Sequence, residues 1–73
     1  MNEKCTKMNK WRDEHGNVYS VEKAVRNGRF VVIRTNPGGH RKAVKRLPAG
    51  GAAHVQRELN GHAQANGWTE GAL

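Results

Sequence analysis

Residues 29–47 read RFVVIRT, NPGG and HRKAVKRL in turn, and this stretch decides the fold. Its first seven residues are rich in β-branched side chains, which favour strands, and Pro37-Gly38 fits a type II turn. Proline sets the backbone angle of the second turn residue, and glycine accepts the positive φ of the third. We therefore expect a β-hairpin in which residues 29–35 pair with a strand that returns over residues 40–47.

Upstream of this hairpin, the pattern predicts residues 11–13 and 18–21 as strands around a Gly/Asn turn. Residues 20–28 fit two structures. They fit a two-turn helix with Ser20 as its N-cap and Gly28 just past its end. They also fit a strand, because Asn27-Gly28 suits a type I′ turn that leads directly into residues 29–35. We favour the strand, since eight residues are few for an unsupported helix.

Downstream, apolar side chains recur at helical spacing from Ala52 through Val55 and Leu59 to Ala63. Asn66-Gly67-Trp68 is typical of a Schellman ending, in which Gly67 is left-handed and Trp68 folds back onto Ala63. The helix start offers only glycine as a cap. We expect this helix to be held by docking its apolar stripe on the sheet rather than by propensity.

These elements predict an α+β domain with a three- to four-stranded antiparallel meander packed against one C-terminal helix. We expect residues 1–10 to be a flexible tail, residues 11–68 to be the single domain and residues 69–73 to be a frayed end. A chain of 73 residues with 12 Leu, Ile, Val and Phe residues has a small core. Its one cysteine, Cys5, has no partner for an internal disulfide.

Two-residue loops at Asn27-Gly28 and Pro37-Gly38 would pair Arg34 with Arg41 across the second hairpin. One face of the sheet would then collect the larger apolar groups and meet the helix. These are Tyr19, Val21, Val25, Phe30, Val32, Ala43 and Leu47. The other face would be mixed, with Val31, Ile33 and Val44 at its centre and Lys42 and Arg46 beside them. A slip of one residue in either hairpin would exchange these faces.

The net charge of +7 is concentrated in one segment. Residues 1–28 carry +2 and residues 47–73 carry −1, whereas residues 29–46 hold six cations and no acid. Segregated charge of one sign favours an anionic polymer as partner. The candidate nucleic-acid-binding residues are Arg29, Arg34, Arg41, Lys42, Lys45 and Arg46. A two-stranded ribbon fits the DNA major groove, and the four aromatic residues are expected in the core, so duplex DNA is favoured over single strands, while RNA stays open.

A second candidate site is the predicted helix start, where backbone N–H groups and nearby cations could receive a phosphate. It comprises Gly50, Gly51, His54 and Arg57. The alternative there is a poorly capped helix end that binds nothing. A rival function for the whole domain is protein–protein interaction, with a homodimer included, through the mixed face around Val31, Ile33 and Val44.

The sequence lacks the residue patterns that other function classes require. The histidines and Cys5 show no zinc-ligand spacing, and no nucleophile lies in a catalytic setting, so we expect no metal, no cofactor and no enzyme activity. No apolar run approaches a membrane span and the N-terminus lacks a signal-peptide core, so a cytoplasmic protein is expected.

The layout over residues 11–68 resembles the arm-type DNA-binding domains of phage integrases and the plant AP2 domain. It shares with them a three-stranded antiparallel meander, basic strands, and Lys45-Arg46-Leu47-Pro48 leading into an alanine-bearing helix. The resemblance implies that the sheet enters the major groove, that the helix braces its back and that the six cations above make the contacts. It also suggests a phage or mobile-element origin. The chain departs from these families at Gly50-Gly51, where a polar cap usually opens the helix.

Overall fold

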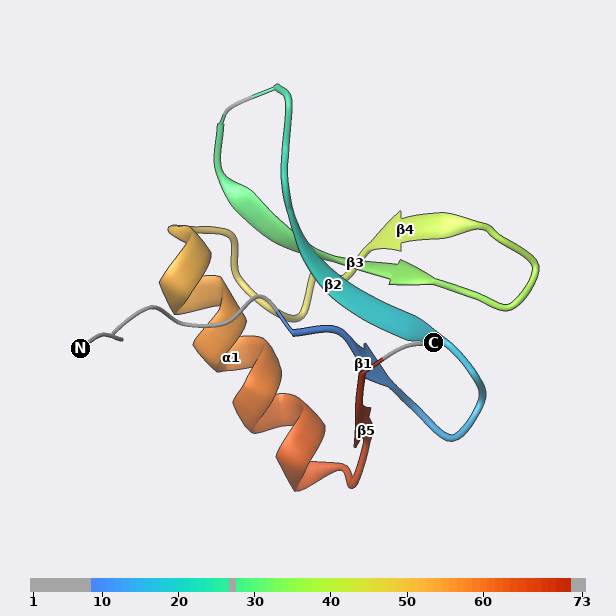
Figure 1. Ribbon diagram of the computed structural model, residues 1–73. Coiled ribbons are helices and arrows are strands. Elements are labelled where there is room, and N and C mark those ends of the chain that lie inside the picture. Colours follow the sequence, from blue (N-terminus) through green and yellow to red (C-terminus); the bar gives the residue numbers. More distant parts are fainter. Residues whose placement is uncertain (1–8, 27, 72–73) are drawn as a thin grey trace.

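The computed structural model describes residues 9–26 and 28–71, which form one antiparallel sheet and one helix (Figure 1). The elements are β1 (Trp11–Arg12), β2 (Val18–Lys23), β3 (Phe30–Thr35), β4 (Arg41–Ala43), α1 (Ala52–Ala65) and β5 (Thr69–Glu70). The five strands lie in the order β4-β3-β2-β1-β5. This confirms the predicted α+β class, a meander packed against a C-terminal helix.

Residues 20–23 belong to a strand, so the helical alternative for this segment is wrong. The β2–β3 connection is longer than the predicted two-residue turn. The Ala24 N–H donates to the Arg29 carbonyl at 2.7 Å, and the Gly28 N–H donates back to the Ala24 carbonyl at 3.0 Å. Lys23 therefore pairs with Phe30. The register differs from the prediction by two residues, and because side chains alternate with period two, each strand keeps its predicted face.

The β3–β4 hairpin has a three-residue loop in place of the predicted two-residue turn. The Gly39 N–H donates to the Asn36 carbonyl at 2.9 Å, and Gly39, rather than Gly38, has the positive φ, at 91°. The Asn36 side chain closes the loop by accepting a hydrogen bond from the His40 N–H at 2.9 Å. As a result Thr35 pairs with Arg41, and the register slips by one residue. The predicted faces of β4 are thus exchanged.

The β1–β2 loop repeats the same design. The Gly16 N–H donates to the Asp13 carbonyl at 3.2 Å, and Gly16 has φ of 84°. The Asp13 carboxylate accepts from the Asn17 N–H, as Asn36 does from His40. In both hairpins an Asn or Asp begins the loop and a left-handed glycine ends it, which is the usual three-residue hairpin with a bulge. The two loops lie close together, since a Cβ added at Gly16 would lie 3.3 Å from the Pro37 ring.

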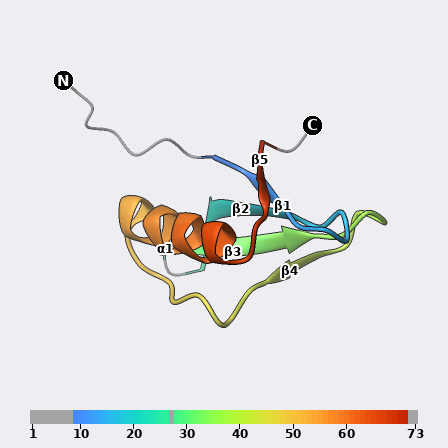
Figure 2. The ribbon, with the colours of Figure 1, turned by 90° about the horizontal axis from the view of Figure 1, so that it is seen from below.

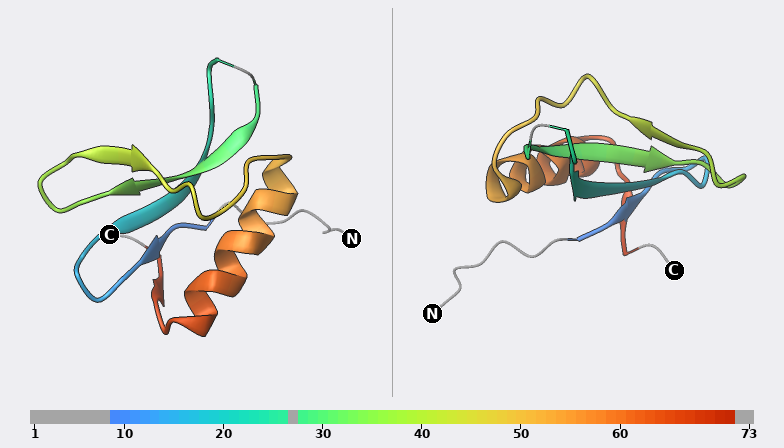
Figure 3. Two further views of the ribbon diagram at one scale, coloured as in Figure 1. Left: turned by 180° about the vertical axis from the view of Figure 1, so that it is seen from behind. Right: turned by 90° about the horizontal axis from the view of Figure 1, so that it is seen from above.

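The core lies between one face of the sheet and α1. Its buried residues are Trp11, Tyr19 and Val32 from the strands and Val55, Leu59 and Ala63 from the helix. The helix presents the predicted stripe to β2 and β3, and the β3–β4 hairpin projects away from it (Figures 1 and 3). Residues 44–51 arch from β4 to the start of α1 (Figure 2).

The helix ends as predicted. The Trp68 N–H donates to the Ala63 carbonyl at 2.9 Å, and Gly67 has φ of 71°, which together make a Schellman ending. Beyond it the sequence predicts a frayed end, but Thr69–Glu70 form β5 and pair with β1. The Gly71 N–H extends this pairing to the Lys10 carbonyl at 2.7 Å. The free edge of β1 thereby gains backbone partners. Residues 1–8, which include Cys5, lie outside the described residues, as do Asn27 of the predicted turn and residues 72–73.

Candidate nucleic-acid interface

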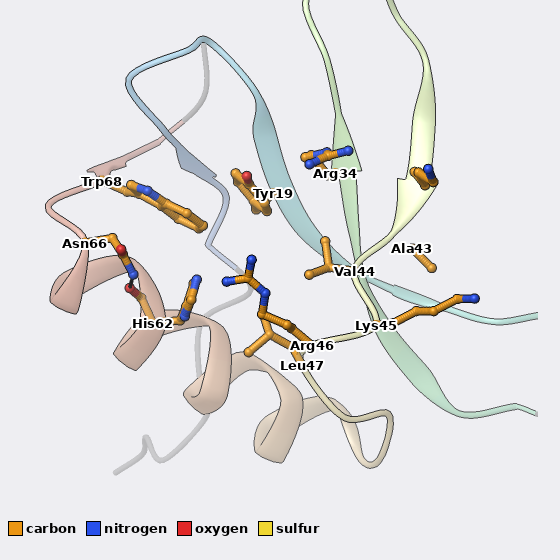
Figure 4. Close-up of a pocket in the computed structure, with 11 residues that line it drawn as sticks. Tyr19, Arg34, Ala43, Val44, Lys45, Arg46, Leu47, His62, Asn66 and Trp68 are labelled. Atoms are coloured by element: carbon orange, nitrogen blue, oxygen red, sulfur yellow. Dashed lines mark hydrogen bonds between the residues drawn. The ribbon is translucent and has the colours of Figure 1, made fainter.

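Four of the six predicted cations surround one hollow. Arg34 and Lys42 pair across β3 and β4, and Arg34 also pairs with the core residue Tyr19, so both point to the helix side of the sheet. Lys45 and Arg46 follow in the segment that arches toward α1. All four line a hollow of about 560 Å³ between this segment and the C-terminal half of the helix (Figure 4). We call these four cations the basic rim and the space they line the Trp68 hollow.

The other two predicted cations lie elsewhere. Arg41 pairs with Thr35, so it points to the sheet face opposite the helix, where its guanidinium forms an ion pair with Glu22. The prediction that Arg34 and Arg41 share a face is wrong, because the three-residue loop shifts β4 by one position. Arg29 lies at the other end of β3 and does not line the Trp68 hollow.

The wall of the Trp68 hollow is aromatic and apolar. The rings of Tyr19 and Trp68 stack with centroids 4.1 Å apart and planes 18° apart. The His62 ring meets Trp68 edge-on at 5.1 Å and 77°. Val44 and Leu47 complete the apolar part of the lining, and Asn66 at the helix end and Ala43 are the remaining lining residues.

Sequence reasoning assigned these aromatic rings to the core and did not foresee the wall. Tyr19 is buried, but Trp68 is only half-buried. One available signal was the Schellman ending, because it returns Trp68 to the last turn of the helix, where His62 also lies. The pairing of Tyr19 with Arg34, which places the ring beside the cations, needed the true β2–β3 register.

The Tyr19 hydroxyl is held by the Asp13 carboxylate, and the Arg34 guanidinium lies near it. The hydroxyl donates to the Asp13 carboxylate at 2.9 Å. Burial raises the pKa of Tyr19, the bond to Asp13 raises it further, and Arg34 opposes both effects without cancelling them. Burial also raises the pKa of Asp13, but hydrogen bonds from Asn17, Tyr19 and the His15 N–H outweigh it and leave that pKa below its ordinary value.

Asp13 is the acid nearest this wall, and its oxygens are already occupied. It accepts from the His15 and Asn17 backbone N–H groups, from the Asn17 amide and from Tyr19. No acid lines the Trp68 hollow, and among the described residues no carboxylate forms an ion pair with a basic-rim side chain. No described carboxylate therefore neutralises the basic rim through an ion pair.

A second hollow of about 520 Å³ lies on the β3–β4 hairpin. It shares Arg34 and Lys42 with the Trp68 hollow and adds Asn36, His40 and Arg41. Arg34 and Lys42 thus connect the Trp68 hollow to the hairpin, while the Arg41 guanidinium pairs with Glu22 on the opposite face.

The predicted phosphate site at the helix start is less open than expected. The Gly50 N–H donates to the Phe30 carbonyl at 3.1 Å, and the Phe30 N–H donates to the Gly50 carbonyl at 2.9 Å. Gly50 is therefore tied to β3, and its N–H is not available to a phosphate. Gly51 is the N-cap without a side-chain hydrogen bond, and His54 and Arg57 are exposed. The first turn has no acid, as the sequence shows.

The predicted mixed face is not assembled as expected either. Val31 and Ile33 lie on the face opposite the helix, but the Val44 N–H donates to the Val32 carbonyl at 2.8 Å and Val44 packs against the core. The same one-residue slip explains this, because it moves Val44 to the helix side. The face opposite the helix, which we call the open face, instead has Ala43 paired with Ile33 and Val18 paired with Thr35.

Within residues 9–26 and 28–71, no three His, Cys, Asp or Glu side chains come close enough to hold a metal ion. The one helix in this part of the chain is too short and too polar to cross a membrane. Comparison of the chain with protein-family models, with curated proteins and with solved structures finds no match.

Proposed function

We propose that this protein is a small non-enzymatic module that binds duplex DNA through the basic rim and the adjoining β3–β4 hairpin. The observation that carries the proposal is the gathering of Arg34, Lys42, Lys45 and Arg46 around one hollow without a carboxylate partner among the described residues. Cations held together in this way attract phosphates and release condensed counterions when DNA binds.

The shape of the hairpin supports duplex DNA as the partner. A two-stranded ribbon is one of the few elements that enter a major groove about 12 Å wide, and here the ribbon projects away from the helix (Figure 1). His40 and Arg41 lie toward its tip, and the basic rim lies toward its base. In this arrangement the tip enters the groove while the rim contacts phosphates beside it. The face opposite the helix, which the integrase and AP2 resemblance would place in the groove, carries Arg41 already paired with Glu22.

Salt titration of DNA affinity tests the proposal. Four phosphate contacts give a slope of about −3.6 in log K against log salt, since each contact contributes about −0.9. Six contacts would give a slope of about −5.4, so the slope also shows whether Arg29 and Arg41 take part.

The matched variants are two double substitutions that each remove one lysine and one arginine. Lys45→Ala with Arg46→Ala removes half of the basic rim and makes the slope shallower, at about −1.8. Lys23→Ala with Arg26→Ala removes the same charge from exposed positions outside both hollows and leaves the slope unchanged. Equal loss in both variants would show a diffuse charge effect, and no binding at 20 mM salt would refute the proposal. A duplex RNA of the same sequence, run in parallel, shows whether the rim distinguishes the two polymers.

A second candidate is self-association through the open face. The half-buried Val18, Val31 and Ile33 and the exposed Ala43 share this face, and Glu22 and Arg41 give it charges of both signs that a second copy would meet in reverse across a twofold axis. Sedimentation velocity at several protein concentrations distinguishes the candidates. A dimer abolished by Ile33→Lys, together with absent DNA binding, would favour this second function.

A further inference from the structure

We propose that the Trp68 hollow binds a nucleoside phosphate, with the flat base against the aromatic and apolar wall and the phosphate at the basic rim. The lining combines an apolar surface with a cationic surface, and no single chemical group of a ligand is complementary to both. Tyr19, Trp68, Val44 and Leu47 offer apolar area, while Arg34, Lys42, Lys45 and Arg46 offer positive charge. A nucleotide carries both complements on one small molecule.

The size of the hollow agrees with this ligand class. About 560 Å³ lies within the range of small-molecule sites, about 300–1,000 Å³. The phosphates of a continuous duplex backbone would reach the rim and leave the apolar wall in water. An inorganic anion would do the same. Arg46 projects toward the middle of the space between Tyr19, His62 and Leu47 (Figure 4), where its planar guanidinium can stack on a base or bind a phosphate.

Contacts within the protein hold the aromatic wall in place. The Trp68 backbone N–H is held by Ala63 at 2.9 Å, and its ring stacks on Tyr19. The Tyr19 hydroxyl is in turn held by Asp13 at 2.9 Å. The Asn66 amide donates to the His62 carbonyl at 2.7 Å and fixes the end of the helix beside the wall. Such preorganisation lowers the entropic cost of binding.

A nucleoside phosphate can reach the hollow from two sources. One is an unpaired nucleotide at the end of a DNA duplex, and this form rests on the proposed function. The other is a free nucleotide. Both present the same base and phosphate, so the arms of the experiment must separate them.

The experiment uses amide and indole NMR spectra of the full chain. Trp68 reports on the hollow, and Trp11, whose indole N–H donates to Asn60 at 2.8 Å in the core, is the internal reference. The probes are adenosine monophosphate, ribose 5-phosphate, a blunt duplex and the same duplex with one unpaired terminal nucleotide. We expect the Trp68 indole signal to shift with the monophosphate and with the overhang, and the Trp11 signal to stay in place.

Affinities give the magnitude. Stacking of one base supplies about a tenfold gain, so the overhang duplex binds about tenfold tighter than the blunt duplex, and adenosine monophosphate about tenfold tighter than ribose 5-phosphate. His62→Ala removes part of the aromatic lining and should reduce both ratios, whereas His54→Ala, at the other end of the same helix, should leave them unchanged. An unmoved Trp11 signal in each variant confirms that the core is intact.

The outcomes separate the two proposals. Binding of both duplexes with equal affinity and no Trp68 shift overturns the nucleotide site and leaves the proposed function standing. A Trp68 shift with the monophosphate but no duplex binding supports the site for free nucleotides and refutes the proposed function. Equal binding of the monophosphate and ribose 5-phosphate shows that the wall contributes nothing, and overturns this inference.

Discussion

Asp13 is the residue whose replacement most sharply tests how the aromatic wall is held. Its carboxylate accepts four hydrogen bonds, from the His15 and Asn17 backbone, the Asn17 amide and the Tyr19 hydroxyl. Asp13→Asn keeps the shape and one acceptor oxygen but puts an N–H donor where the Asn17 amide and Tyr19 now donate. Because the carboxylate is partly exposed and screened by solvent, we expect a loss of about 1–2 kcal/mol in unfolding free energy. For a domain of this size the melting temperature falls by roughly 5–10 °C.

The pH dependence isolates the charge of Asp13. Its pKa is held below the ordinary value of 3.8 in the folded state, so its contribution is complete above that value and is lost as the pH falls through the folded pKa. The assay is urea unfolding at pH 7 and at pH 3. The wild type should lose more stability than Asp13→Asn between these two values, and the two proteins should approach each other at low pH.

Glu14→Gln is the matched control. Glu14 is the next carboxylate in the chain, is exposed and lies 3.7 Å from the His15 imidazole. Its replacement should leave both the stability at pH 7 and the pH dependence close to those of the wild type. If Asp13→Asn and the wild type lose stability in parallel down to pH 3, the charge of Asp13 does not stabilise the loop or Tyr19.

Three further predictions concern the core, the hairpin and Tyr19. Leu59 is fully buried at the centre of the core, so Leu59→Ala should cost about 3 kcal/mol in urea unfolding, and a loss under 1 kcal/mol would mean that the helix is not docked as described. Gly39→Ala should destabilise the protein by about 1 kcal/mol because φ is 91° at this position, whereas Gly38→Ala should be nearly neutral. A larger loss for Gly38→Ala than for Gly39→Ala would instead support the two-residue turn. Since the pKa of Tyr19 is raised above 10.0, its phenol should ionise later than a free tyrosine in an absorbance titration at 295 nm, and its stabilising contribution, present below pH 10, should be lost as the pH rises through the folded pKa.

The sequence predicts the strands and the helix of this fold better than it predicts the register in which the strands pair. The strand at residues 30–35, the helix stripe from Val55 to Ala63 and the Schellman ending at Gly67 are local patterns, and local chemistry decides them. Register depends on loop length, which the turn dipeptides left ambiguous. Pro37-Gly38 fits a type II turn, but the side chain of Asn36 and the left-handed Gly39 close a loop one residue longer.

That single residue changed the candidate site. It moved Lys42 to the helix side with Arg34, placed Arg41 beside Glu22 on the other face and packed Val44 against the core. The basic segment was visible from charge counting, yet the grouping of four of its cations around one hollow was not. Predicting the aromatic wall also requires long-range information, because Tyr19 and Trp68 are far apart in the chain. They come together because β2 lies beside the end of the helix. The pairing of β5 with β1 is long-range in the same way.

The most direct measurement of whether the basic rim binds DNA is chemical-shift mapping of the full chain with a short blunt duplex at low salt. We predict that the shifted amides cluster in residues 34–47, with Arg34, Lys42, Lys45 and Arg46 among the largest changes, while Val18, Val31 and Ile33 on the open face stay in place. Shifts concentrated on the open face, or spread evenly over the protein without a maximum at the rim, would contradict the proposed interface.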